Sequence, residues 1–283
     1  MVDPINHKEV HSLLVEVALA AGDMILAAQP HIATVGTKQN SADLVTETDK
    51  AVEQYVITTL KGKYPELDFL GEETYTIGKK LTNKPTFICD PIDGTVNFVH
   101  TLPNVCISLA LAIHKKPVVG VVYNPYTTHL YSAIKGQGSF LTMPVLLQVQ
   151  APSQPQPSPT RGTGINWNIK YETFAKLAGG REQGGKMVHS LRSMGSAALN
   201  FCAVAAGQID VYWEGGCWAW DVAAGWLILT EAGGIVVDAN PGNWSPTIDG
   251  RRYMAVRAAP AGQREIVEEF WSIIPEGGYD YSS

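Results

Sequence analysis

The first part of the chain has hydrophobic residues at helical spacing. Between residues 8 and 28 an apolar residue recurs at every third or fourth position, which predicts an amphipathic helix. The residues on this face are Val10, Leu13, Leu14, Val17, Ala21, Met24, Ile25 and Ala28. A second helix is predicted near residues 47–62, because Thr46 followed by Asp49 is close to a capping box and apolar residues again repeat at helical spacing. The polar stretch 36–49 is predicted to be a loop.

From residue 86 the pattern changes to short, β-branched apolar segments separated by polar turns. Residues 86–90, 105–113, 117–124 and 129–134 predict the strands of an antiparallel sheet. Farther along, the pattern predicts helices near 195–207, 221–232 and 261–273, and strands at 233–238 and 251–258. Because helices and strands are grouped rather than strictly alternating, we expect an α/β protein of the layered α+β type and not a barrel.

One stretch interrupts this organisation. Residues 149–164 are rich in proline and glutamine, a composition that packs and pairs poorly. We therefore expect three parts: an N-terminal α+β half over 1–145, a Pro-rich loop or seam over 146–164, and a C-terminal α/β half over 165–283.

Composition narrows the range of partners. The chain has 283 residues, 45% of them hydrophobic, and a formal charge of -6, so it lacks the basic surface that would bind nucleic acid phosphates. Its first fifteen residues lack the apolar region of a signal peptide, and no stretch approaches 18 uncharged apolar residues. We therefore expect no membrane association and a cytoplasmic location. The cysteines form no C-x-x-C pair and are expected to be buried free thiols.

Acidic residues gather in one short stretch of this otherwise ordinary sequence. Glu72 and Glu73 precede Asp90 and Asp93, and no lysine or arginine separates the two aspartates. The segments before Gly71 and before Asp90 are predicted strands that would deliver these carboxylates to one end of a sheet. Two carboxylates about 4 Å apart repel by roughly 4 kcal/mol at an effective dielectric of about 20. Their convergence therefore implies a proton, a basic partner or a cation.

Three interpretations of these acids compete. They can be solvated loop charges in turns, the acid and base of a glycosidase, or ligands of hard cations. Ligands that are all oxygen fit Mg²⁺, and the absence of a Cys/His cluster argues against zinc. The short spacing of Asp90 and Asp93 favours the third interpretation, because the Ile92 carbonyl can also face the ion.

A further acid, Asp221, directly precedes a predicted apolar helix. An aspartate at that position can cap the helix. It can equally turn its carboxylate toward a ligand at the same helix end, where the helix dipole favours bound phosphate.

Three segments together resemble the signatures of the inositol monophosphatase family. They are Gly71-Glu72-Glu73, the run DPIDGTVNF from Asp90 to Phe98, and WDVAAG from Trp220 to Gly225, in the family's order and at comparable spacing. The resemblance extends from about residue 8 to the C-terminus. The sequences of 194–207 and 212–221 are similar to those of fungal members, some of which are associated with quinate metabolism. The family comprises Mg²⁺-dependent, Li⁺-sensitive phosphomonoesterases with a layered αβαβα sandwich, a fold shared with fructose-1,6-bisphosphatases. Its members are commonly homodimers.

The resemblance implies a set of metal ligands. Glu72, Asp90 and the Ile92 carbonyl would hold one Mg²⁺ ion. Asp90, Asp93 and Asp221 would hold a second.

It also implies catalytic residues. Glu72, and Glu73 with it, would serve a looser third ion through waters. The attacking water would be oriented by Thr95 and Asp49, so the expected catalytic residues are Asp49, Thr95 and Glu72.

The substrate is expected to be a small phosphorylated polyol. The residues expected to contact it are Gly94, Thr95, Gly195, Ser196, Ala197, Glu214 and Asp221. Two of these have simpler alternatives: Ser196 can be a helix N-cap and Glu214 a surface charge.

The chain departs from the family pattern at 144–165. The family carries a strand and its following turn there, whereas this sequence is Pro/Gln-rich, so we expect a missing strand and a less stable second half.

Two rival functions remain open: a catalytically silent regulatory protein of quinate metabolism, and a relative acting on a bisphosphorylated nucleotide or fructose bisphosphate. The bisphosphate relative would need extra basic residues around the sugar. The first choice remains hydrolysis of inositol monophosphate to inositol and phosphate.

Overall fold

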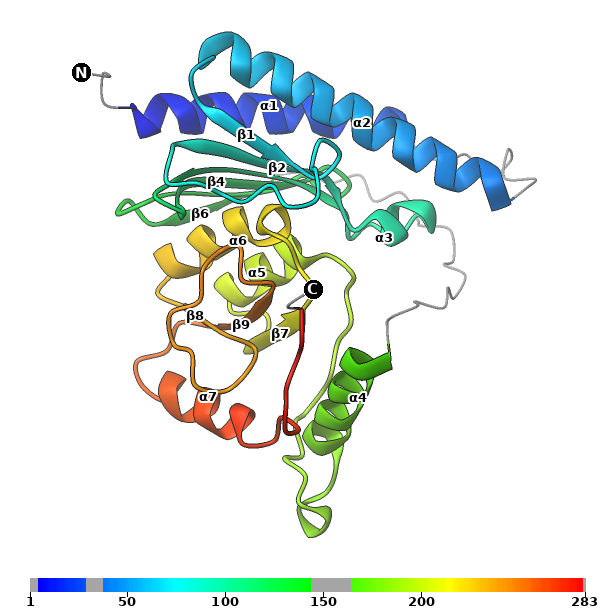
Figure 1. The fold of residues 1–283 in the computed structure, drawn as a ribbon, viewed down its shortest axis with the longest axis vertical. Coiled ribbons are helices and arrows are strands. Elements are labelled where there is room, and N and C mark those ends of the chain that lie inside the picture. The colour runs from blue at the N-terminus through cyan, green and yellow to red at the C-terminus, as the bar shows by residue number, and fades with distance from the viewer. Residues whose placement is uncertain (1–4, 29–37, 144–163, 282–283) are drawn as a thin grey trace.

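The computed structural model describes residues 5–28, 38–143 and 164–281 (Figure 1). Its first part contains α1 (His7–Ala27), α2 (Lys38–Lys63), β1 (Asp68–Gly71), β2 (Thr86–Asp93), α3 (Thr95–Val99), β3 (Cys106–Ile113), β4 (Lys116–Asn124), β5 (His129–Ile134) and β6 (Ser139–Thr142). The second part contains α4 (Gly164–Ala178), a 3₁₀ turn (Arg181–Gln183), α5 (Ala197–Ala205), β7 (Val211–Gly215), α6 (Ala219–Glu231), β8 (Ile235–Val237), β9 (Arg252–Val256) and α7 (Gln263–Trp271).

The strands form two sheets. The larger has the order β1-β2-β3-β4-β5-β6; β1 and β2 are parallel and the other neighbours antiparallel. The smaller has the order β7-β9-β8 and is antiparallel. From top to bottom, Figure 1 shows α1 and α2, the larger sheet, α5 and α6, the smaller sheet, and then α7 with α4. This is the expected αβαβα sandwich.

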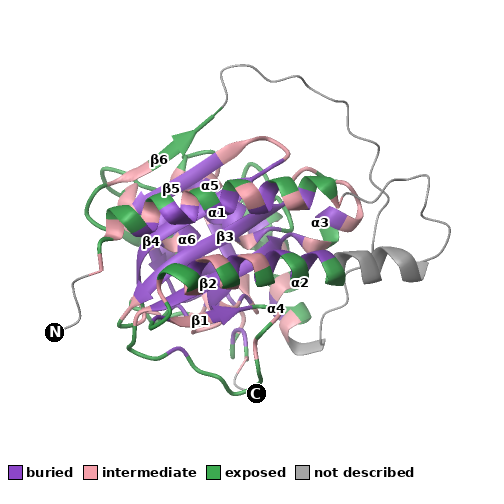
Figure 2. Ribbon diagram, turned by 90° about the horizontal axis from the view of Figure 1, so that it is seen from above, coloured by how far each residue is buried: buried purple, intermediate pink, exposed green. Residues whose placement is uncertain are grey.

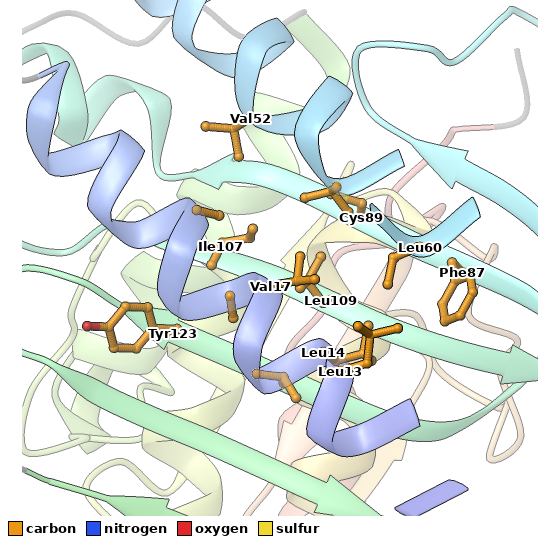
Figure 3. Close-up of a cluster of buried hydrophobic side chains, with 14 of the residues drawn as sticks. Leu13, Leu14, Val17, Val52, Leu60, Phe87, Cys89, Ile107, Leu109 and Tyr123 are labelled. Carbon is orange, nitrogen blue, oxygen red and sulfur yellow. The ribbon is translucent and has the colours of Figure 1, made fainter. Parts of the chain in front are cut away.

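The helical face predicted for the start of the chain is the inner face of α1. Asn6 caps this helix by accepting from the amides of Lys8 and Glu9, and the predicted apolar residues pack on the sheet together with Val52 and Leu60 of α2. Figure 3 shows this cluster between the two helices and the strands, and Figure 2 shows the opposite side of α1 and α2 exposed. Among the described helices, α1 is the one long and apolar enough to cross a membrane, yet here its apolar residues lie against the sheet.

One predicted boundary is wrong. The stretch 36–49 was expected to be a loop, whereas α2 already begins at Lys38 and contains both Thr46 and Asp49. Residues 38–61 contain no glycine or proline, so nothing in the backbone chemistry stops the helix from extending through this polar segment. The proposed capping box at Thr46 therefore lies inside a helix.

Residues 149–163 of the Pro-rich segment lie outside the described residues, as does the expected seam over 146–164 apart from Gly164, where α4 begins. Almost all of the chain between β6 and α4 lies outside the described residues, so the expected loss of a strand stays a prediction. The four cysteines, which are all described, are buried and free as expected.

Candidate active site

The parallel pairing of β1 and β2 brings Glu72 next to Asp90. Gly71 at the end of β1 is in register with Cys89, and the amide of Glu72 donates to the Cys89 carbonyl at 3.3 Å. The residues that follow these partners, Glu72 and Asp90, therefore lie side by side at the carboxyl ends of the two strands. Their carboxyl groups share a hydrogen bond.

An irregularity in β2 turns Asp93 toward the same place. Residues three apart in a regular strand point to opposite faces of the sheet. Here Asp90 pairs with Ser108 and Asp93 with Cys106, so three steps along β2 match two steps along β3. The extra residue is a bulge, which restores both aspartates to one side. Asp90 Oδ1 supports the bulge by accepting from the Ile92 amide at 3.1 Å.

Asp93 is then fixed by the start of α5. Its Oδ2 accepts from Ser196 Oγ at 2.6 Å and from the Ala198 amide at 2.7 Å, and its Oδ1 from the Ala197 amide at 3.3 Å. These are the unpaired amides of a helix N-terminus, which favour a negative charge. The carboxylate of Asp93 thus has a single orientation before any ligand binds.

Asp221 reaches the cluster from α6. It was expected directly before this helix, but α6 begins at Ala219, so Asp221 lies in the first turn. Its Oδ2 accepts from the Trp218 amide at 2.6 Å, and its carboxyl group also hydrogen bonds with Asp90. The capping and site-facing interpretations of Asp221 therefore apply together, because one carboxyl group caps the helix and faces the other acids.

Asp49 completes the group from α2. Its side chain is 5% exposed, and its Oδ1 atom has no hydrogen-bond partner. Burial, followed by the charges of Glu72, Glu73 and Glu53, raises the pKa of Asp49 to about 8. A buried oxygen without a partner is costly and needs an explanation such as an absent ion or water.

The other acids share this electrostatic problem. Burial raises the pKa of Glu72 to about 7 and that of Asp93 to about 6, in each case against hydrogen bonds that lower it. Burial and the Asp93 charge raise the pKa of Asp221 to about 8, and burial with Asp93 and Glu72 raises the pKa of Asp90 well above its usual range. None of the ion pairs among the described residues involves these acids.

The donor set fits a hard divalent cation. It consists of carboxylate oxygens and the Ile92 carbonyl, which are ligands that Mg²⁺ prefers. Within the described ranges no three acidic, histidine or cysteine side chains are arranged so that they could hold a metal ion as they stand. The mutual repulsion of the acids and the unpartnered oxygen of Asp49 are nevertheless what a positive charge would relieve.

Gly94 and Thr95 follow the bulge. Gly94 has φ 98°, and a Cβ there would lie 2.8 Å from the Asn104 carbonyl, so glycine is required at this turn. Thr95 Oγ1 donates to the Ile92 carbonyl at 3.2 Å, which leaves its oxygen able to accept a hydrogen bond. Gly94 and Thr95 were expected to lie beside the acids, and in the structure they directly follow Asp93.

Two of the residues expected to bind substrate at 195–197, Ser196 and Ala197, stabilise the start of α5 and the orientation of Asp93. Ser196 is the N-cap of α5, accepting from the Leu199 amide at 3.2 Å while its hydroxyl donates to Asp93. The Ala197 amide also holds Asp93. The N-cap alternative for Ser196 is therefore realised, and direct contact of this segment with a substrate stays a prediction.

Glu214, at the end of β7, is not a free surface charge. Lys170 of α4 lies 2.8 Å from its Oε1, and Tyr212 donates to its Oε2 at 2.9 Å. Glu214 and Gly195 line a cavity of about 1110 Å³ between α4, β7 and the segment before α5. None of the clustered acids lines this cavity, but Gly195 does, and the next residue, Ser196, bonds to Asp93.

Sequence reasoning missed two residues that shape this region. Asn97 of α3 donates to both the Asn104 and the Met194 carbonyls at 2.8 Å, which ties α3 to the segment leading into α5. Glu53 of α2 accepts from the amides of Glu73 and Thr74. Glu53 lies one helical turn after Asp49, and that spacing was the signal that could have found it.

The chain matches the Inositol monophosphatase family over residues 6–275. It is 48% identical to inositol monophosphatase 2 of Saccharomyces cerevisiae over 246 residues, 83% of each chain. It is 35% identical to protein qutG of Emericella nidulans over 315 aligned positions, covering 96% of this chain and 95% of the other. The structure of staphylococcal IMPase-II with inositol monophosphate bound superposes with a TM-score of 0.68 at 26% identity, covering 93% of this chain and 94% of that one. The chain therefore belongs to the inositol monophosphatase family.

Proposed function

We propose that this protein hydrolyses inositol monophosphate to inositol and phosphate in a Mg²⁺-dependent reaction. The observation that carries the proposal is the convergence of Glu72, Asp90, Asp93 and Asp221 without a basic partner among the described residues. Family membership and the likeness to an enzyme with inositol monophosphate bound support the choice of substrate.

Each proposed ligand has a defined source in the fold. Glu72, Asp90 and the Ile92 carbonyl would hold one Mg²⁺ ion, and Asp90, Asp93 and Asp221 a second, with a third held loosely near Glu72. When bound, these ions would neutralise the acids, attract the phosphate and lower the pKa of water.

The protein's own groups orient the reactants. The Thr95 hydroxyl, anchored on the Ile92 carbonyl, would accept a hydrogen bond from the attacking water. Asp49 has one oxygen without a hydrogen-bond partner, and its carboxylate, once ionised, would accept a proton from that water. The backbone amides of Gly94 and Thr95 would donate to phosphate oxygens.

On the far side Glu214 would accept hydrogen bonds from the ring hydroxyls. Its pairing with Lys170 makes this wall nearly neutral, so it adds no net positive charge for a second phosphate. This disfavours a bisphosphorylated nucleotide or sugar. The alternative of a silent regulatory protein of quinate metabolism is disfavoured because the sequence keeps every proposed ligand together with Asp49 and Thr95. The cytoplasmic location and the homodimer remain predictions.

Phosphate release tests the proposal. The purified protein would be assayed with myo-inositol 1-phosphate, an adenosine bisphosphate and fructose bisphosphate, each with Mg²⁺ and with a chelator. We expect Mg²⁺-dependent release from the inositol phosphate. The control is Glu72→Gln, which removes the charge of a proposed ligand beside Asp90 and should abolish release while leaving the fold intact. A folded wild-type protein that releases phosphate from none of the three would refute the proposal.

A further inference from the structure

Glu53 is a buried acid with a specific task. It lies on α2, one turn after Asp49, and only 1% of it is exposed. Its Oε2 accepts from the Glu73 amide at 2.9 Å and its Oε1 from the Thr74 amide at 2.8 Å. Among the described residues no ion pair involves Glu53. Both of its oxygens are thus spent on two consecutive amides of the loop that carries Glu72.

With Glu53 in place, each backbone amide from residue 72 to residue 75 has an acceptor. The Glu72 amide bonds to the Cys89 carbonyl, those of Glu73 and Thr74 to Glu53, and that of Tyr75 to the Glu72 carbonyl. Only a carboxylate offers an acceptor oxygen to each of two neighbouring amides, since a glutamine presents one oxygen and one NH₂. The loop therefore depends on the carboxylate for its conformation.

Gly71 gives independent support. A Cβ at this position would overlap the Glu53 carboxylate. The close approach of Glu53 to the backbone is therefore possible only because residue 71 is glycine. On the other side of the loop, the Tyr75 ring packs against Trp218 and Trp220, with centroids 5.1 and 5.2 Å away. Glu72 is thus held between an anchor on α2 and one on the residues that begin α6.

We propose that Glu53 is a positioning residue for cation binding: its carboxylate fixes the Glu72 loop so that Glu72 stands beside Asp90. This inference rests on the proposed function, because it assigns Glu53 an effect on Mg²⁺ binding through Glu72. Glu53 itself would touch neither substrate nor reacting atoms. The negative charge of Glu53 adds to the repulsion among the acids. What its carboxylate contributes in return is the pair of hydrogen bonds that it accepts from the Glu73 and Thr74 amides.

Two substitutions separate shape from charge. Glu53→Gln keeps the length and removes the charge, and Glu53→Asp keeps the charge but is too short to reach both amides. Glu47→Gln is the matched control, because Glu47 is an exposed acid on the same helix. Hydrogen exchange of the metal-free protein, followed in peptides covering 70–77, measures how strongly the amides of the Glu72 loop are protected. We expect both Glu53 variants to exchange at least about tenfold faster in this segment, with the control unchanged.

Mg²⁺ binding, measured by calorimetry, provides the second reading. The dissociation constant should rise at least about tenfold in both Glu53 variants. At saturating Mg²⁺, kcat and the KM for inositol phosphate should stay within about threefold of wild type. A purely structural residue would lower the thermal midpoint without a selective loss of Mg²⁺ affinity. Unchanged exchange in 70–77, or unchanged Mg²⁺ affinity in folded variants, would overturn the inference.

If neither Glu53 variant folds, Gly71→Ala decides the question with Glu53 intact. The new methyl group should displace the carboxylate and reproduce the fast exchange and the weak Mg²⁺ binding; a Gly71→Ala protein with wild-type values for both would refute the inference. A wild-type protein without phosphatase activity, whose Glu53 variants still show both changes, would refute the proposed function and leave the role of Glu53 standing.

Discussion

The acids at the edge of the larger sheet and Asp238 after β8 are buried in opposite ways. Asp238 is 4% exposed, forms an ion pair with Arg252 at 3.2 Å, and accepts from the Asn240 amide at 2.9 Å. Asp90 is 2% exposed, and within the described part of the chain the charged groups that shift its pKa are Asp93, Glu72 and Asp221, which are all acids. A buried acid with a cation beside it maintains the fold. A cluster of acids without one stores repulsion that a ligand can relieve.

The largest effect is expected from Asp90→Asn. Phosphate release should fall by about a thousandfold, because Asp90 is the proposed ligand shared by both ions. The thermal midpoint of the metal-free protein should be equal to or above that of wild type, because one of the mutually repelling acids is gone. Steady-state assays and thermal unfolding in a chelator measure the two quantities. A marked loss of stability would mean that Asp90 is primarily a structural residue, like Asp238.

Asp238→Asn should give the reverse pattern. Unfolding free energy should drop by about 2 kcal/mol, less than the roughly 3–5 kcal/mol of a fully buried broken pair, because the Arg252 side chain is 34% exposed. Denaturant unfolding measures this loss, and kcat should remain within about twofold of wild type. If activity falls together with stability, the two regions are not independent.

The stabilising effect of Mg²⁺ should depend on pH. The raised pKa values mean that the folded metal-free protein keeps protons that the unfolded chain releases near pH 4. The contribution of these acids to stability therefore falls as pH rises from about 4 to about 8. Cations bind the ionised acids, so Mg²⁺ at about a hundred times its dissociation constant should add roughly 2.7 kcal/mol at pH 8.

At pH 5 the same Mg²⁺ concentration should add little, because most of the acids hold protons. Thermal unfolding with and without Mg²⁺ at both pH values tests this expectation. Equal stabilisation at pH 5 and pH 8 would show that binding does not require these acids to ionise.

The smallest effect is expected on the opposite wall. Lys170→Met removes a partly exposed pair with Glu214, worth about 0.2–1 kcal/mol, so the KM for inositol phosphate should rise by no more than about threefold. Lys176→Met is the control, because Lys176 lies on the same helix and its ammonium group donates to the Ile273 carbonyl, away from Glu214. A tenfold or larger rise for Lys170→Met would show that this wall contributes to substrate binding as strongly as the acids contribute to cation binding.

Much of the fold could be predicted from sequence because apolar periodicity reports burial directly. The inner face of α1 and the strands 86–90 and 105–113 are examples. The start of α2 could not be predicted in this way, since a polar segment without apolar periodicity can be helix or loop. The clustering of Glu72 and Asp90 was predictable because each follows a predicted strand, and their parallel pairing supplied the rest.

Other parts of the site depend on contacts that no local pattern contains. The spacing of Asp90 and Asp93 in a regular strand would place them on opposite faces, and only the register with β3 reveals otherwise. Glu53 is a charged residue of a type usually found on the surface, yet it is buried under a loop twenty residues farther along the chain. The partner of Glu214, Lys170, comes from a helix whose position is set by tertiary packing.

The bulge between Asp90 and Asp93 makes the site sensitive to chain length rather than to composition at that point. Replacing Pro91 by another residue would alter a few contacts. Deleting either residue between the aspartates would leave every acid in the sequence, yet it would change the spacing that brings Asp90 and Asp93 onto one side of the strand. A substitution at Pro91 should thus leave the two acids together, while a single lost codon would separate them.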